Sequence, residues 1–212
     1  MAKPARILCV DTSDVTLGCI IARAGEIEGQ VLHHGQRDHC KNIITLTDQL
    51  LQDVGLVLSD IDGFACIIGP GSFTGLRIGL MAAKTFAYVE NKPLLGINTF
   101  ERMVQTDHLG NAVYVWPAQR GHCYATQSPL ASPDHFRFGP MDKIIDADAH
   151  IYSPQGFEIN NRQQTSLPFA EICGTPLAQR LDLHWQEKRR LDPQQSAPLY
   201  IQEVAAKKNL GS

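Results

Sequence analysis

The sequence predicts an α/β fold with two lobes, of which the first is the better defined. Apolar runs and helical repeats alternate over residues 6–105 in the order β-β-β-α-β-α-β-α. A glycine-rich turn at residues 69–79 joins a strand-like run to a helical run. After about Gln105 the patterns weaken, which indicates a reduced second lobe.

The first lobe is expected to begin with three short-linked strands, which should pair antiparallel because their turns are short. This order differs from a simple Rossmann order. By topological analogy, it is the order of one lobe of the actin-like, or ribonuclease-H-like (ASKHA), fold. The expected elements are strands at 6–10, 17–22 and 27–33, a helix at 38–54, a strand at 64–68, a helix at 74–90, a strand at 93–97 and a short helix capped by Thr99.

The second lobe is assigned to residues 106–195, and residues 1–105 plus about 196–212 to the first. A hairpin around Arg120-Gly121 and a helix from Pro176 to Trp185 are its clearest elements. Residues 128–168 are rich in Pro, Asp, Gln, Ser and Asn and carry poor patterns. A short final element is expected from Leu199 to Lys207, and no tandem repeat is evident.

Composition excludes several classes of protein. The chain has 212 residues, 43% of them hydrophobic and 19% charged, so it can bury a sizeable core. The formal net charge of −3 and the lack of a basic stripe argue against direct tRNA binding. None of the six cysteines forms a Cys-x-x-Cys pair, and no run approaches membrane-spanning length. A soluble, reduced, cytoplasmic protein is expected.

The glycine-rich turn has the composition of a phosphate-binding loop. Its backbone N–H groups precede a helix, where the helix dipole favours anions. A closing Gly-Lys-Ser/Thr is missing, so the turn is not a P-loop, and Ser72 also lacks the Gly-x-Ser-x-Gly spacing of a nucleophile. Ser72 is therefore interpreted as a capping hydroxyl. The candidate phosphate or nucleotide contacts, including the first hairpin, are Asp11, Thr12, Ser13, Gly69, Gly71, Ser72, Thr74 and Gly75.

The helix after this turn carries small residues every four positions, at Gly75, Gly79, Ala83 and Ala87. Each glycine inside a helix costs about 1 kcal/mol relative to alanine, so a close backbone neighbour should compensate. That neighbour is either the lobe's own sheet or a helix of another subunit. The preceding helix has more apolar residues than a narrow stripe needs, which favours a docking face. The candidate interface residues are His39, Ile43, Leu46, Leu50, Gly75, Arg77, Gly79, Ala83 and Ala87.

A metal site is not expected. His33, His34, His39 and Cys40 lie close in sequence, but none of them forms a pair with the i, i+4 spacing of zinc ligands on a helix. His39 is interpreted as a residue at the start of a helix that packs or donates a hydrogen bond. No catalytic residue is assigned.

Three motifs resemble the bacterial TsaB (YeaZ) family: Ile7-Leu8-Cys9-Val10-Asp11-Thr12-Ser13, Arg37-Asp38-His39 and residues 69–79. The resemblance covers residues 6–105 and returns at Ala197 to Ile201, where Gln202 replaces the family's arginine. At the start of the second lobe, Pro117-Ala118-Gln119 stands where the family carries Asp-Ala-Arg. This departure puts a polar binding role of the second lobe in doubt.

The resemblance implies a non-catalytic subunit that pairs with TsaD, the related catalytic subunit that installs threonylcarbamoyl on the adenosine beside the anticodon of tRNAs reading codons that begin with A. It implies docking through helices 38–54 and 74–90, a TsaE-like ATPase as a further partner, indirect contact with tRNA, and a homodimer when alone. No cofactor is expected to bind tightly, and ATP or ADP at the TsaD junction stays open. The alternative is a stand-alone enzyme of the same fold, either an ATP phosphotransferase or a metal-dependent glycoprotease-type hydrolase.

Overall fold

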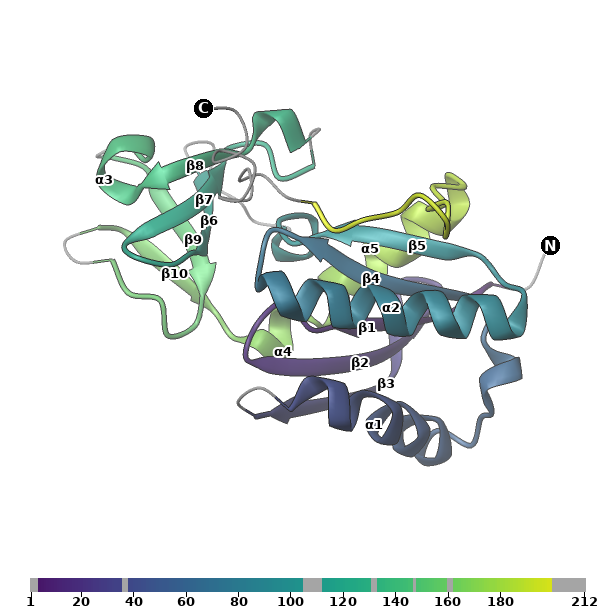
Figure 1. Cartoon of the computed structure of the whole chain (residues 1–212). Helices are drawn as coiled ribbons and strands as arrows, with labels where there is room; N and C mark the ends of the chain where they lie inside the picture. Colours follow the sequence, from purple (N-terminus) through teal and green to yellow (C-terminus); the bar gives the residue numbers. More distant parts are fainter. Residues whose placement is uncertain are drawn as a thin grey trace, which may run out of the picture.

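The computed structural model describes residues 4–35, 38–104, 112–130, 133–146, 148–159 and 162–199. It contains two five-stranded mixed sheets, each forming the centre of one lobe (Figure 1). None of the helices in these residues is long and apolar enough to cross a membrane. The predicted α/β fold with two lobes is confirmed.

The first sheet has the strand order β3-β2-β1-β4-β5. Strands β1 to β3 form an antiparallel meander, and β4 and β5 run parallel to β1. The predicted order of elements is confirmed, with bounds that shift by one or two residues. The elements are β1 (Arg6–Asp11), β2 (Thr16–Arg23), β3 (Glu26–His34), α1 (His39–Asp53), η1 (Leu58–Asp60), β4 (Gly63–Gly69), α2 (Phe73–Glu90), β5 (Leu94–Asn98) and η2 (Glu101–Met103).

Helices cover both faces of this sheet because its strands alternate buried side chains between the faces. Leu8 and Val10 of β1 pack in one cluster with α1 and α2. Ile7 and Cys9, which point to the other face, pack with α5 (Thr175–Gln186). Figure 1 shows α1 and α2 together on one side and α5 on the other.

The second sheet repeats the topology of the first. Its order is β10-β9-β6-β7-β8, with β6 to β8 antiparallel and β9 and β10 parallel to β6. The helices of this lobe are short: in the described part of the connection between β8 and β9, the four-residue α3 is the one helix. The hairpin around Arg120-Gly121 is confirmed. The elements are β6 (Ala112–Pro117), β7 (His122–Thr126), η3 (Pro133–His135), β8 (Arg137–Pro140), α3 (Met141–Ile144), β9 (His150–Pro154), β10 (Gln164–Leu167) and α4 (Phe169–Ile172).

The boundary expected at residue 195 needs correction. The predicted helix forms as α5, but Leu177 and Leu181 pack on the first sheet. Leu191 also bridges to Leu94 of β5. The apolar stripe of α5 is buried against the face of the first sheet that α1 and α2 do not cover. Lys84 Nζ donates to the Ser196 carbonyl, so residues near 196 also return to the first lobe. The element expected from Leu199 to Lys207 lies, beyond Leu199, outside the described residues.

Candidate functional site

The glycine-rich turn lies at the end of β4 and leads directly into α2. The Gly75 N–H donates to Ser72 Oγ at 3.2 Å, so Ser72 caps the helix, as predicted. The Thr99 Oγ1 hydroxyl donates to the Pro70 carbonyl at 2.5 Å from the end of β5. The turn is therefore held from both sides by hydrogen bonds within the first lobe.

The first hairpin and the glycine-rich turn contact each other directly. Ser72 N–H donates to the Ser13 carbonyl at 2.8 Å, and Thr12 Oγ1 donates to the Gly75 carbonyl at 2.7 Å. A Cβ atom added to Gly75 would lie 2.0 Å from the Thr12 carbonyl oxygen, and one added to Gly79 would lie 2.3 Å from Thr12 Oγ1. The two glycines thus allow the turn after β1 to approach the first two turns of α2.

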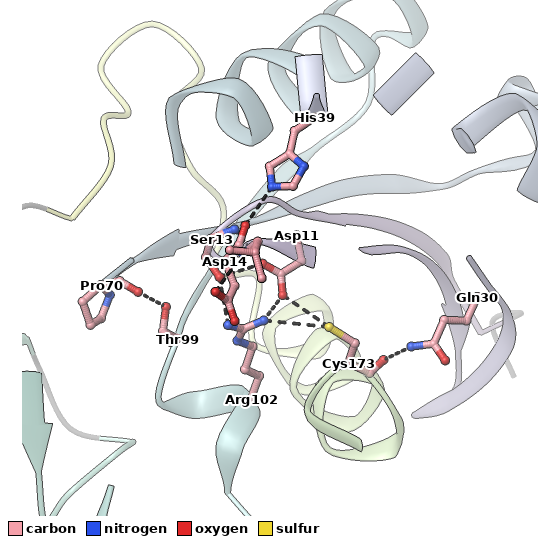
Figure 2. A network of polar contacts seen from close by, with 10 residues as sticks. Asp11, Ser13, Asp14, Gln30, His39, Pro70, Thr99, Arg102 and Cys173 are labelled. Atoms are coloured by element: carbon pink, nitrogen blue, oxygen red, sulfur yellow. Dashed lines mark hydrogen bonds and ion pairs between the residues drawn. The ribbon is translucent and has the colours of Figure 1, made fainter. Parts of the chain in front are cut away.

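The carboxylate of Asp11 is fully occupied by groups of the chain itself (Figure 2). Arg102 of η2 forms a buried ion pair with Asp11 Oδ2. Ser13 donates to Asp11 Oδ1 from its backbone nitrogen at 3.0 Å and from its hydroxyl at 2.8 Å. The Cys173 thiol donates to Oδ2 at 3.3 Å. Both carboxylate oxygens of Asp11 are therefore engaged by groups of the chain, and its role as a phosphate or nucleotide contact stays a prediction.

Arg102 belongs to this site, although no motif or periodicity in the sequence singled it out. Its side chain is completely buried, and Nη2 donates to Ser13 Oγ at 2.8 Å. Its guanidinium lies 4.8 Å from the ring centre of Trp116 and 5.5 Å from that of Phe169. Burial lowers the pKa of Arg102, yet the guanidinium beside Asp11 stays charged at neutral pH because an arginine side chain is not deprotonated in proteins.

Cys173, which also approaches Asp11, is not set up as a nucleophile. Burial raises the pKa of its thiol to about 12, so the thiol is protonated at neutral pH. The thiol therefore acts as a hydrogen-bond donor to the carboxylate.

An open cleft of about 760 Å³ lies beside this junction, between the start of α2 and the second lobe. One wall carries Ser72, Phe73 and Thr74, and the other carries the β6–β7 hairpin and Phe138. The ring of Phe138 stacks on His122 at 5.3 Å between ring centres and packs at a tilt against Tyr124 at 4.9 Å. The candidate residues Gly71, Ser72 and Thr74 line this cleft, whereas Asp11 and Thr12 are buried beneath it.

The predicted stripe of small residues is not a surface of the molecule. All four of its residues are buried, and Ala83 and Ala87 belong to the core cluster that contains α1 and the sheet. The neighbour that compensates for the glycines is therefore the lobe's own sheet and first hairpin. The other candidate interface residues divide into buried ones, namely His39, Ile43 and Leu50, the half-buried Leu46, and the exposed Arg77.

The outer face of α2 and α1 carries large exposed apolar side chains instead. Tyr88, Val89 and Met81 of α2 are 86%, 66% and 60% exposed, and Ile44 of α1 is 56% exposed. Arg77 continues this face toward the start of α2, where its guanidinium lies 3.9 Å from the ring centre of Phe73. The side chains of Ile44, Met81, Tyr88 and Val89 form apolar surface that remains exposed in the folded chain. We refer to Ile44, Arg77, Met81, Tyr88 and Val89 as the outer face.

The histidines near the start of α1 serve the fold. His39 is buried and its Nε2 lies 2.7 Å from the Asp14 carbonyl, which agrees with the interpretation of a packed helix-start residue. His33 Nε2 lies 2.9 Å from Asp38 Oδ2 and holds the pKa of that carboxyl below its ordinary value. Among the described residues, no group of three or more His, Cys, Asp or Glu side chains could hold a metal ion.

Known proteins similar to this chain in sequence belong to two related groups, TsaD and TsaB. The family model described as TsaD, tRNA N6-adenosine threonylcarbamoyltransferase, matches residues 26–131. The TsaB protein of Escherichia coli K12 is 36% identical over 103 residues, which cover 47% of this chain and 43% of that protein. The TsaD-type transferase of Methylobacterium nodulans is 27% identical over 231 residues, covering 92% of this chain and 66% of the relative.

The fold matches a solved structure along nearly the whole chain. The structure of YeaZ from Pseudomonas aeruginosa has a TM-score of 0.68 at 20% identity, covering 93% of this chain and 100% of that one. The chain spans about half the length of the curated TsaB relatives that it matches. Because the matched family model covers half of the sequence and TsaB proteins are among its relatives, the chain belongs to the TsaB/YeaZ family, which is related to TsaD.

Proposed function

We propose that this chain is a non-catalytic partner subunit of a TsaD-like transferase in the formation of threonylcarbamoyladenosine in tRNA. The observation that carries the proposal is the outer face of α1 and α2. Four large apolar side chains there are more than half exposed. Exposed apolar side chains that cluster on one face are typical of protein–protein contact surfaces, and the core of such surfaces is depleted in charge.

The state of Asp11 supports a non-catalytic role. In an actin-like enzyme, acidic residues near the first hairpin hold Mg²⁺ and the hairpin wraps phosphates. Here the Asp11 carboxylate pairs with Arg102 and accepts three hydrogen bonds from Ser13 and Cys173. Binding of Mg²⁺-ATP at this carboxylate would require breaking a buried ion pair, which is strongly unfavourable.

The proposed assembly assigns the chemistry to other subunits. The TsaD-like partner carries out the transfer, a TsaE-like ATPase joins the complex, and tRNA contacts this chain only indirectly. ATP or ADP would then bind at the junction with the partner rather than in the isolated chain. When the partner is absent, the same outer face would pair two copies of this chain.

The proposal is tested in a strain in which this protein is depleted, by measuring threonylcarbamoyladenosine in digested tRNA by mass spectrometry. We expect depletion to lower the modified nucleoside and wild-type protein to restore it. The double variant Met81→Asp/Tyr88→Asp should fail to restore it, because charge on the outer face opposes docking. Leu130→Asp, which changes a half-exposed apolar residue in the second lobe, should restore it. Unchanged modification after depletion would refute the proposal.

A further inference from the structure

Arg102 contacts parts of both lobes from a short segment between them. It lies in η2, which follows the last strand of the first sheet. Its ion-pair partner Asp11 ends β1 of the first sheet, whereas Trp116, whose ring faces the guanidinium, belongs to β6 of the second sheet. Phe169 in α4, where the chain returns from the second sheet, lies on the same guanidinium. One buried cation is thus shared by the first hairpin, the second sheet and the returning segment.

We propose that Arg102 is an interlobe lock. Its guanidinium fixes the end of β1 against β6 and α4, and so sets the relative position of the two lobes and of the cleft between them. By pairing with the Asp11 carboxylate, it also prevents that carboxylate from binding a metal cation. This role is independent of the partner proposed above.

The chemistry of the pair favours a positional role over a role in stability. A buried ion pair loses the hydration of both charges, and replacing it with apolar residues is often neutral for stability. A guanidinium is planar and donates hydrogen bonds in fixed directions, so it specifies one arrangement of its neighbours. Arg102 donates to Ser13 Oγ and forms an ion pair with Asp11, both in the first lobe. The same guanidinium also lies against the rings of Trp116 and Phe169.

Apolar contacts between the lobes do not specify position in the same way. Phe100 packs edge-on against Phe136 at 4.9 Å between ring centres, in a cluster that also contains Met103 and Trp116. Apolar contacts are non-directional and tolerate rearrangement at similar volume. The proposal therefore predicts that the lobes stay associated without Arg102 but lose a single relative position.

The test measures the distance between spin labels in the two lobes of the full chain. Cys40 is exposed on α1 and the other five cysteines are buried, so it can be labelled selectively. Leu130→Cys, at a half-exposed position of the second lobe, supplies the second label. The distance distribution is compared in otherwise wild-type protein, in Arg102→Met, and in Asp11→Asn/Arg102→Met. Arg23→Met, which removes a surface ion pair with Glu28, is the matched control.

Arg102→Met leaves the Asp11 carboxylate buried without its cation, so we expect its unfolding equilibrium constant to rise on the order of a thousandfold. The double variant removes both charges and should return close to wild-type stability. Its distance distribution should nevertheless be about twofold broader than that of the wild type, because domains without a fixed interface move relative to each other. Arg23→Met should keep the wild-type distribution.

The double variant decides the question even if Arg102→Met does not fold. A stable double variant with a broad distribution supports the lock. A stable double variant with the narrow wild-type distribution would overturn it, since the apolar cluster alone would then position the lobes. A double variant that does not fold would also overturn it, because the pair would then be needed for folding rather than for position.

Discussion

The inner and outer faces of α2 differ in both side-chain size and exposure. The inner face carries Gly75, Gly79, Ala83 and Ala87, all buried against the first hairpin and the sheet. The outer face carries Met81, Tyr88 and Val89, each at least 60% exposed. Small residues at helical spacing therefore mark close packing inside this lobe, and the apolar surface that the fold leaves exposed lies on the opposite side of the same helix.

Of the changes on the two faces of α2, the largest effect on stability is expected from enlarging the inner face at Gly75. Gly75→Ala places a Cβ 2.0 Å from the Thr12 carbonyl oxygen, so the hairpin or the helix must move. Overpacking of this kind costs about 1–3 kcal/mol or more, which outweighs the gain of about 1 kcal/mol from alanine's helix propensity. We expect a net loss of about 2 kcal/mol in the free energy of unfolding, measured with urea. Thr85→Ala, on the exposed side of α2, should stay within about 0.5 kcal/mol of wild type. Equal stability of the two variants would contradict the packing described for the inner face.

A smaller loss of stability is expected from removing the hydrogen bond that joins the first hairpin to the inner face of α2. Thr12→Val keeps the side-chain shape but loses the donor to the Gly75 carbonyl, and Thr12 is buried. The cost should be about 1–2 kcal/mol in urea unfolding. Thr12→Ser, which keeps the hydroxyl, should lose less. If Thr12→Val is more stable to urea than Thr12→Ser, packing of the Thr12 methyl group stabilises the fold more than the hydrogen bond does, which would contradict this prediction.

Truncation on the outer face should leave stability almost unchanged. Met81 and Tyr88 are 60% and 86% exposed, so Met81→Ala and Tyr88→Ala remove little buried area from the isolated chain. We expect changes within about 0.5 kcal/mol. Thermal or urea unfolding of the monomer would measure this. A loss above about 2 kcal/mol would show that these side chains pack in the fold and are not free for a partner.

The smallest effect concerns the start of α1, where His33 depresses the pKa of Asp38. Because the pKa of Asp38 is lower in the folded than in the unfolded chain, its contribution to stability is present above the ordinary value near 3.8 and is lost as pH falls through the folded value. His33→Ala should move the Asp38 titration midpoint upward toward 3.8. A carboxyl NMR titration checks this. Identical midpoints in both proteins would rule out the His33 contact as the cause.

The sequence predicted the first lobe well because its elements have strong local patterns. Strand alternation, glycine turns and the stripe of α1 each depend on neighbouring residues. The second lobe was predicted only at its hairpin. Strands β8 to β10 have only four or five residues each, and a pattern that short cannot be distinguished from loop composition.

The site was predicted in part, and the limits have physical causes. Sequence analysis grouped the first hairpin and the glycine-rich turn as parts of one candidate site, and the structure places them in contact. It could not show that the stripe of small residues faces the hairpin, because periodicity identifies a face but not its neighbour. Arg102 was missed because Glu101-Arg102 reads as two ordinary surface charges, and only the fold brings Asp11 and Trp116 to it.

The central claim, docking through the outer face, is tested most directly by titrating the purified chain into a purified TsaD-like partner in a calorimeter. Met81→Asp/Tyr88→Asp should bind at least about tenfold more weakly than wild type, because charge would be buried at the centre of the interface. Leu130→Asp, the matched control in the second lobe, should bind as wild type does. Wild-type affinity in the folded outer-face variant would contradict the account, and it would place the partner surface elsewhere on the molecule.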